Sequence, residues 1–464
     1  MEININNIKR VYFIGIGGIG MSALARYFNH LGKKVAGYDS TESPLTNKLV
    51  SESIGIHFTD DINEIPNDFI TNKEHTLVVY TPAIPNNHTE LQFFKNNNYQ
   101  MVKRAKALGI IANSCITAAI AGTHGKTSTS SLLAHILSQT PQGCNAFLGG
   151  IAKNFESNLV LNDKGANRLI VEADEFDRSF LHLKPKLAVI TSIDADHLDI
   201  YKTYKGVVDA FKDFVSGIQN GGVLIIKKGH EDIASANKSI KVYTYSMSQK
   251  ADFWAKNIAG SEGHYSFDLV TPLGTYKGLK LGILGKYNIE NAIAASAAAI
   301  IWGINNQELH NGLSTFKGIA RRFDLQFKGH TSIYIDDYAH HPEELKAAIS
   351  SVRDMFPKRK ITGVFQPHLY SRTNDFTNEF AQSLSLLDEL ILLDIYPARE
   401  QPIPGVTSEI ILNRVTCTQK SICTLNQLVS TLKEMPIDIL LTLGAGSIDR
   451  VVTDIVQMLK ERDS

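Results

Sequence analysis

The feature that most restricts the fold of this chain is a glycine–lysine loop between an apolar run and a helix-forming run. Residues 116–121 are almost entirely apolar, Gly122, Gly125 and Lys126 follow, and residues 130–139 favour a helix. A strand, a glycine turn and a helix N-terminus make a cradle for phosphate, because backbone N–H groups can approach its oxygens closely. The stretch therefore predicts a parallel α/β unit that binds a phosphate-bearing ligand.

The loop is tighter than the usual phosphate loop. The pattern GxxxxGK[ST] asks for a glycine five positions before Gly125, and Ile120 stands there. A glycine turn with a solvated lysine is the alternative for Gly-Lys-Thr alone, but the flanking strand and helix favour phosphate binding. In that interpretation Lys126 neutralises the terminal phosphates and the Thr127 hydroxyl binds Mg²⁺.

A second glycine loop lies near the N-terminus. Residues 10–14 predict a buried strand, 21–31 a helix and 34–38 the next strand, which ends at Asp39. This is the strand–GxGxxG–helix–strand–acid order of a dinucleotide fold, with the acid about twenty residues after the glycines. A phosphate is the expected ligand, and tight strand–helix packing is the alternative; the glycines concerned are Gly15, Gly17, Gly18 and Gly20.

Composition excludes several classes of protein. Lys+Arg and Asp+Glu are both 47, so no excess charge points to nucleic acid or to an anionic membrane surface. From residues 2–7, which precede a predicted strand, we expect no signal peptide, and no apolar run in the sequence reaches membrane-spanning length. Four cysteines without CxxC spacing indicate a reducing compartment, so we expect a cytoplasmic protein. A monomer and a homodimer are both compatible with this composition.

Strand and helix signals alternate along all 464 residues, which predicts α/β domains with largely parallel sheets. We place domain boundaries at 1–109, 110–320 and 321–464, with a linker at 109–114 and a small antiparallel excursion at 265–284. In the second segment, Glu172 and Asp194 open acidic clusters at two predicted strand ends, where open α/β sheets bind ligands.

Metal binding is the chemistry we expect from those clusters. Glu172 is the best second Mg²⁺ ligand beside Thr127, and His197 is a candidate for a second divalent ion. For Glu172 the alternative is a capped strand-end carboxylate. For His197 the alternative is a hydrogen-bonded loop histidine, and the chemistry alone favours neither interpretation of His197.

The third segment concentrates polar rings and cations at two predicted strand ends. Arg372 could bind a carboxylate in a forked geometry, although the spacing alone favours an unpaired surface arginine. The other residues are Tyr338, His340, His341, His368 and Tyr370.

Seven stretches, taken in order, resemble the Mur ligase family: AGTHGKT, EADEFDRSF, DADHLD, GKYNIENAIAA, GIARRF, DDYAHHP and FQPHLYSRT. The resemblance runs from Val11 to the terminal helix. It implies a Rossmann-like N-terminal domain for a UDP-sugar, a central P-loop ATPase-type domain and a C-terminal Rossmann-like domain for an amino acid. It also implies ATP-dependent joining of L-alanine to the lactyl carboxylate of UDP-N-acetylmuramate.

The resemblance assigns residues by position. Lys126 would hold the β- and γ-phosphates, Thr127 and Glu172 one Mg²⁺, and His197 a second. The UDP-sugar would meet Gly15, Gly17, Gly18, Gly20 and Asp39, and the amino acid Tyr338, His340 and Arg372. ATP would meet Gly122, Thr123, His124, Gly125, Lys126, Thr127, Ser128, Asn288, Asn291, Arg322 and Asp337. Tyr287 stands where the family often has histidine, which removes the adenine contact expected there.

The implied reaction passes through an acyl phosphate, with Lys126 in a catalytic role and His340 as a candidate base for the amine proton. Closure of the third segment onto the second is expected, because Arg322 and Asp337 would otherwise not reach ATP. Three alternatives stay open. They are a related ligase that recycles a preformed peptide, a nicotinamide dehydrogenase resting on Gly15–Gly20 and Asp39, and a non-catalytic nucleotide switch or scaffold.

Overall fold

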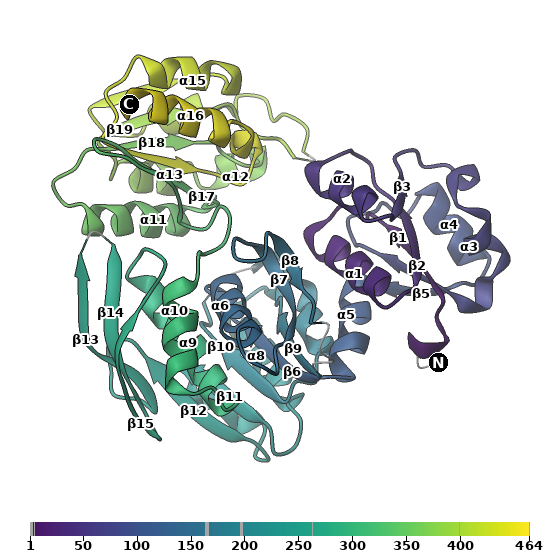
Figure 1. Ribbon diagram of the computed structural model, residues 1–464. Coiled ribbons are helices and arrows are strands. Elements are labelled where there is room, and N and C mark those ends of the chain that lie inside the picture. The colour runs from purple at the N-terminus through teal and green to yellow at the C-terminus, as the bar shows by residue number, and fades with distance from the viewer. Residues whose placement is uncertain are drawn as a thin grey trace. The chain divides into compact units, whose positions relative to one another are not determined.

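The computed structural model describes residues 3, 5–162, 167–194, 198–261, 263–398 and 400–463. Its strands form three sheets, which follow one another along the chain (Figure 1). The three-domain α/β class expected from the sequence is confirmed. By its internal contacts the chain divides into two compact units. The first unit is Met1–Asn257, Phe267–Leu279 and Glu290–Lys317; the second is Ile258–Ser266, Lys280–Ile289 and Gly318–Ser464.

The N-terminal sheet is parallel and has the order β3-β2-β1-β4-β5. Its central strand β1 is buried on both faces, which is why the sequence there is a continuous apolar run. The strands are β1 (Arg10–Ile14), β2 (Lys34–Tyr38), β3 (Gly55–His57), β4 (Thr76–Tyr80) and β5 (Gln100–Lys103). The helices are α1 (Ile19–His30), α2 (Pro44–Ser51), α3 (Asn67–Thr71), α4 (Thr89–Asn96) and α5 (Arg104–Asn113).

The prediction of a linker at residues 109–114 is wrong, because helix α5 extends through this stretch as far as Asn113. Gly109 lies inside this helix rather than in a turn. A Cβ at Gly109 would approach the carbonyl oxygen of His182 to 2.8 Å, so glycine permits close packing of the helix there.

The central sheet has the order β15-β14-β13-β12-β11-β10-β6-β9-β7-β8. Strand β6, which leads into the Lys126 loop, lies between β10 and β9 and is parallel to both. The strands are β6 (Ile116–Ala121), β7 (Asn145–Ala152), β8 (Ser157–Val160), β9 (Arg168–Glu172), β10 (Leu187–Ile190), β11 (Val223–Lys227), β12 (Lys241–Ser246), β13 (Phe253–Ser261), β14 (His264–Thr271) and β15 (Gly274–Lys280). The two acidic clusters therefore follow the two strands that flank the phosphate loop.

Helices of this region are α6 (Lys126–Ser138), α7 (Leu198–Tyr201), α8 (Tyr204–Ser216), α9 (Tyr287–Ile301) and α10 (Asn306–Thr315). Short 3-10 segments are η1 (Ile5–Asn7), η2 (Ile62–Glu64), η3 (Lys73–His75), η4 (Phe176–His182), η5 (Glu231–Ala236) and, near the C-terminus, η6 (Ser447–Val451). The excursion expected at 265–284 is longer than predicted, because it already begins with β13.

The C-terminal sheet has the order β16-β17-β21-β18-β19-β20, with β16 antiparallel at one edge. Its strands are β16 (Asp324–Lys328), β17 (Ile333–Asp337), β18 (Ile361–Phe365), β19 (Glu389–Leu392), β20 (Gln419–Ile422) and β21 (Ile439–Leu443). Its helices are α11 (Pro342–Met355), α12 (Tyr370–Asp375), α13 (Thr377–Leu384), α14 (Glu409–Leu412), α15 (Leu425–Lys433) and α16 (Val452–Asp463). As expected, Pro342 opens α11, and Glu344 completes its capping box.

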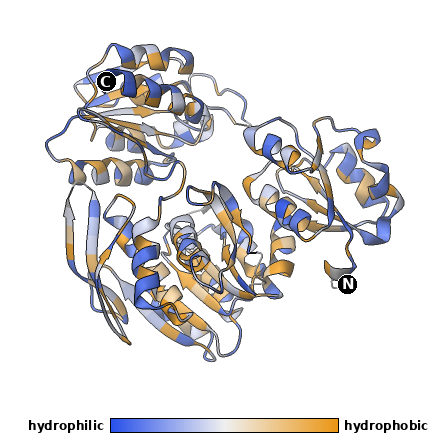
Figure 2. Cartoon of the chain, viewed as in Figure 1, coloured by the Kyte–Doolittle hydropathy of each residue, from blue (hydrophilic) through white to orange (hydrophobic). Residues whose placement is uncertain are grey.

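Apolar residues gather on the strands and on the helix faces that cover them, while the outer faces of the helices are polar (Figure 2). Within the described residues, no helix combines the length and the apolar character needed to cross a membrane.

Candidate functional site

The phosphate loop has the shape expected of an anion cradle. Gly122 and Gly125 have φ of 132° and 82°, in the region that favours glycine. A side chain at Gly122 would collide with the Thr191 hydroxyl, and one at Gly125 with the Asn291 side chain. Gly125 is the N-cap of α6 and supplies no side-chain cap, so the amides of the first turn face the loop. The loop thus offers backbone donors at a positive helix end.

Lys126 begins α6 and turns its ammonium back into the loop. Its Nζ donates to the Gly122 carbonyl oxygen at 2.7 Å and to Glu175 Oε1 at 2.8 Å. Glu175 is only 1% exposed, and burial raises the pKa of its carboxyl group while the Lys126 charge opposes that shift. Glu175, the fourth residue of EADE, was not among the site residues predicted from the sequence.

The two expected Mg²⁺ ligands meet. Thr127 Oγ1 donates to Glu172 Oε1 at 3.1 Å, and the Gly149 amide donates to Glu172 Oε2 at 3.0 Å. A side chain at Gly149 would collide with the carboxylate, so glycine leaves that space open. His197 lies outside the described residues. Among those that are described, no three His, Cys, Asp or Glu side chains form a group that could hold a metal.

The remaining loop residues line one edge of the cradle. Thr123 Oγ1 lies 2.8 Å from Ser192 Oγ and 3.0 Å from Asp194 Oδ2, so the cluster after β10 holds the loop. His124 is exposed, and Ser128 is half-buried in the first turn of α6. These contacts place Asp194, the first residue of the second acidic cluster, beside the phosphate loop, as its position after β10 predicts.

The N-terminal glycine loop has a comparable geometry. Gly15 has φ of 86°, and α1 begins after Gly18 with no side-chain cap. The Gly17 amide donates to Asp39 Oδ2 at 2.7 Å, so Asp39 fixes the loop. A Cβ at Gly17 would lie 2.9 Å from that oxygen, and one at Gly20 would lie 2.7 Å from Arg104 Nη1. The structure therefore brings the glycines and Asp39 together.

A polar network between the same sheet and helix α4 was not expected. The Tyr12 hydroxyl lies 2.7 Å from both His57 Nε2 and Glu90 Oε2. The Glu90 side chain is completely buried, and burial raises the pKa of its carboxyl group to about 7. His57 and Glu90 lie 33 residues apart in polar surroundings, and nothing in their local sequence indicates that they meet.

In the second unit, Asp337 holds the loop that presents Arg322. Its carboxylate accepts from the amides of Phe323 at 2.6 Å and Ala339 at 2.8 Å. Arg321 and Phe323 both have positive φ, at 62° and 48°, so the loop is strained on each side of Arg322. Burial raises the pKa of Asp337 to about 6. The predicted pair of Arg322 and Asp337 is thus part of one constrained loop.

Polar rings gather beside that loop. The Arg322 guanidinium lies 5.2 Å from the centre of the Tyr338 ring, and the Tyr338 ring contacts His340 edge-on. His340 Nδ1 lies 3.0 Å from the Tyr338 carbonyl oxygen, and burial lowers the pKa of this imidazole. His340 also packs against His368, with ring centres 5.8 Å apart.

Two side chains here keep a buried nitrogen without a hydrogen-bond partner among the described residues: His368 at Nδ1 and Arg372 at Nη1. Burial lowers the pKa of His368 to about 4, so the ring is neutral. Leu369, between them, has φ of 72° and is strained. His368 was grouped with Arg372 from the sequence but received no role. Orphaned buried donors are the signal that adds it to the site.

The two asparagines of α9 predicted to contact ATP belong to different units of the chain. Asn288 is 4% exposed, and its Nδ2 donates to the Leu284 carbonyl oxygen at 2.7 Å, within the second unit. Asn291 borders Gly125 of the phosphate loop, within the first unit. Tyr287 packs edge-on against Phe323.

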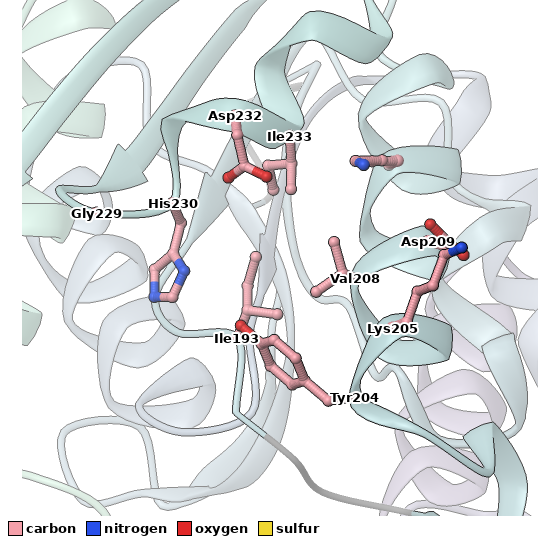
Figure 3. Close-up of a pocket in the computed structure, with 10 residues that line it drawn as sticks. Ile193, Tyr204, Lys205, Val208, Asp209, Gly229, His230, Asp232 and Ile233 are labelled. Carbon is pink, nitrogen blue, oxygen red and sulfur yellow. The ribbon is translucent and has the colours of Figure 1, made fainter.

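A surface pocket of about 310 Å³ lies between α8 and η5, with Ile193 near its floor and His230 and Tyr204 on its walls (Figure 3). None of the predicted site residues that the structure describes lines it. The phosphate loops are therefore not part of this pocket.

Comparison with known proteins agrees with the geometry. Three family models match in succession: Mur ligase family, catalytic domain, over residues 10–115; Mur ligase middle domain over 120–299; and Mur ligase, glutamate ligase domain, over 321–446. The chain is 50% identical to a UDP-N-acetylmuramate–L-alanine ligase of Parabacteroides distasonis over 457 residues, 98% of each chain. It is 46% identical to a protein of the same name from Flavobacterium johnsoniae, covering 99% of this chain and 100% of that one.

Solved structures show the same fold. A UDP-N-acetylmuramate–alanine ligase from Thermotoga maritima aligns with a TM-score of 0.81 at 24% identity, over 98% of this chain and 99% of that chain. A murein peptide ligase from Psychrobacter arcticus aligns with a TM-score of 0.70 at 21% identity, over 97% and 98%. The family models together cover most of the chain, and the two glycine loops lie where those models begin. This chain belongs to the Mur ligase family.

Proposed function

We propose that this chain is an ATP-dependent ligase that joins L-alanine to the lactyl carboxylate of UDP-N-acetylmuramate, in peptidoglycan precursor synthesis. The observation that carries the proposal is the Lys126–Thr127–Glu172 cradle in a chain that is 50% identical, over nearly its full length, to proteins of that name. ATP and UDP-linked sugars are nucleotides of the cell interior, so we assign the reaction to the cytoplasm. The product would serve wall growth, cell shape and division.

The central domain would bind ATP. Backbone amides at the start of α6 and the Lys126 ammonium would neutralise the phosphates, which is the main task in phosphoryl transfer. Thr127 and Glu172 offer adjacent hard oxygens, which suit Mg²⁺, and His197 stays a candidate for a second ion. A bound Mg²⁺ would supply further neutralisation of phosphate charge. Asn291 beside the loop, and Asn288, would contact the nucleotide.

The chemistry follows from the poor reactivity of a carboxylate at neutral pH. Its oxygen would attack the γ-phosphorus, the bond to the β-phosphate oxygen would break, and an acyl phosphate and ADP would form. The alanine amine would then attack the acyl carbon through a tetrahedral intermediate, and inorganic phosphate would leave. Lys126 would act on the first step, because charge on the transferring group is greatest there.

The C-terminal domain would bind the amino acid. Arg372 and His368 bury nitrogens with no partner in the described chain, and a carboxylate would satisfy both. His340 is supported as the base, because donation from Nδ1 to the Tyr338 carbonyl leaves Nε2 to accept a proton. Its lowered pKa keeps the imidazole neutral, as a base requires. Tyr338, stacked on Arg322, would form the wall of the site.

The glycine loop before α1 would bind the UDP diphosphate, with Asp39 close to the nucleotide. The same geometry would suit NAD, so the proposal rests on the second phosphate loop, which a dehydrogenase does not need. Two phosphate-bearing substrates account for two loops.

Phosphate release from ATP tests the proposal. It should require both UDP-N-acetylmuramate and an amino acid, and alanine should be the best of a panel. Mass spectrometry should find the amide product at the mass of the UDP-sugar plus alanine less water. A preference for a preformed peptide over alanine would instead identify the recycling ligase. Tight NADH binding at the N-terminal loop, with no competition from the UDP-sugar, would revive the dehydrogenase. Phosphate release without either cosubstrate would favour a nucleotide switch.

A further inference from the structure

The Lys126 ammonium has three protons, and the protein directs all of them. Gly122 and Thr123 offer carbonyl oxygens at 2.7 and 3.4 Å, and Glu175 offers a carboxylate oxygen at 2.8 Å. The carbonyls belong to the phosphate loop itself. Glu175 comes from a different element, the segment after β9, and carries the only full charge among the three acceptors.

The backbone around Glu175 is fixed independently of Lys126. Its carbonyl oxygen accepts from the Tyr201 hydroxyl and from the Arg178 amide at 2.9 Å. Asp177 and Arg178 have positive φ, at 52° and 54°, so the chain turns sharply just beyond Glu175. Strain of this kind persists only where the surroundings enforce one conformation. Glu175 is therefore a rigid anchor for a flexible lysine.

A lysine side chain loses considerable rotamer freedom when it is held in one place. If that freedom is already lost before the nucleotide arrives, nucleotide binding does not bear the entropic cost of ordering the side chain, and the ammonium is preorganised. A carboxylate that is 1% exposed also keeps its cation close, because a buried charge without its partner is costly. Both effects hold the ammonium at the Gly122 carbonyl.

We propose that Glu175 is a positioning residue, which holds the Lys126 ammonium in the phosphate loop in the orientation that receives the nucleotide's phosphates. The inference rests on the proposed function of this loop as the ATP site. In this role Glu175 acts through Lys126.

A double-mutant cycle on nucleotide affinity tests this. ADP, and ATP without the other substrates, are titrated calorimetrically into the full-length wild type, Glu175→Gln, Lys126→Met and the double variant. Glu175→Gln retains the volume and a hydrogen-bond acceptor, and should raise the Kd for ADP about tenfold, as expected for loss of one charge-assisted hydrogen bond. In the Lys126→Met background the same change should leave Kd within about twofold, because nothing is left to position.

Two further variants exclude a general effect. Asp177→Asn removes one negative charge from an exposed side chain of the same segment and should leave Kd unchanged. Glu175→Asp keeps the charge with a shorter reach and should recover part of the affinity that Glu175→Gln loses. Thermal melting without nucleotide is measured for all variants, so that a folding defect is recognised by its loss of the wild-type transition.

The outcomes separate the two proposals. If Lys126→Met leaves ADP binding unchanged, the loop is not the nucleotide site and the proposed function fails. If Lys126→Met weakens binding but Glu175→Gln weakens it equally in both backgrounds, Glu175 is structural and the inference fails. Tighter ADP binding in Glu175→Gln would show that the carboxylate competes with phosphate, which also overturns the inference.

Discussion

Arg372 and His368 each bury a nitrogen for which the described residues offer no hydrogen-bond partner. Arginine presents a planar fork that matches a carboxylate, whereas lysine is a point charge, so the two are not equivalent at such a site. Arg372→Lys should therefore raise the KM for alanine ten- to a hundredfold, on the order of one lost charged hydrogen bond, and the KM for ATP hardly at all. Initial rates with each substrate varied in turn measure this; equal rises for both would mean that Arg372 does not recognise the amino acid.

Glu90 provides a prediction about pH. Its pKa is raised by burial to about 7, against 4.5 for the free group, so the folded protein resists ionising it while the unfolded chain does not. The contribution of Glu90 to the free energy of unfolding is therefore full below pH 4.5 and is lost as the pH rises through 7. Glu90→Gln removes that dependence and keeps an acceptor for Tyr12. Its stability relative to wild type should rise between pH 4.5 and 8, by up to about 3 kcal/mol.

Chemical denaturation of both proteins at several pH values measures the difference. His57, whose pKa is lowered by burial, has Nε2 3.3 Å from Glu90 Oε1, so its titration is coupled to that of Glu90 and the measured difference belongs to the pair. Tyr38, Asp60 and His88 also face this network and are shared by both. A difference that stays constant from pH 5 to pH 8 would show that Glu90 is ionised normally in the folded protein.

The loop from β1 to α1 requires glycine at position 17, because neighbouring side chains leave no room there for a Cβ. A Cβ at Gly17 would lie 2.8 Å from Thr46 Cγ2 and 2.9 Å from Asp39 Oδ2. Gly17→Val should therefore displace the loop and weaken UDP-N-acetylmuramate binding at least tenfold, since the amides at the N-terminus of α1 would no longer approach a diphosphate. Calorimetric titration without ATP measures it.

Gly55→Val is the matched control for that loop variant. Gly55 lies in β3 of the same sheet, where the nearest neighbour of a Cβ would be Ala36 at 3.9 Å. A β-branched residue is favourable in a strand, so binding should be unchanged. Equal loss in both variants would mean that the sheet, and not the loop, responds.

The bounds of strands could be predicted from the sequence where a strand is buried on both faces. The strands at 10–14 and 34–38 have the predicted bounds, because a parallel sheet covered by helices needs a continuous apolar run. Strands β7 and β8 were not predicted, since the Gly149–Gly150 pair interrupts any pattern in β7. Thr127 and Glu172, which were predicted to share one Mg²⁺ beside adjacent parallel strands, are in hydrogen-bond contact, and their metal role stays a prediction. The pairing of Glu175 with Lys126 depends on a strained turn that no local pattern reveals. The domain boundaries at 109/110 and 320/321 stay predictions.

At the scale of the whole molecule, neighbours in sequence belong to different units. Leu279 is fully buried and belongs to the first unit, whereas Leu284 is 6% exposed and packs in the core of the second with residues such as Ile333 and Leu345. Each leucine supports only the core that surrounds it. Truncating a buried leucine costs about 2–5 kcal/mol.

Leu284→Ala should therefore destabilise the second unit, and Leu279→Ala the first. Hydrogen exchange measured by mass spectrometry should show faster exchange in β17 and β18 for Leu284→Ala, with β6 and β10 unaffected. Leu279→Ala should not change exchange in β17 and β18. If both variants loosen the same strands, the two units do not unfold separately.

The division of the chain into two interleaved units also has a consequence for synthesis. The polypeptide passes from one unit to the other after Asn257, Ser266, Leu279, Ile289 and Lys317. On a ribosome, residues 258–266 and 280–289 emerge before the rest of the second unit has been made, and the first unit lacks its last helices until residue 317 has left the tunnel. Leu284 stays exposed to solvent until the strands that cover it, which begin about fifty residues later, have been synthesised. Apolar side chains of the second unit such as Leu284 thus stay without their core until the strands of that unit have been made.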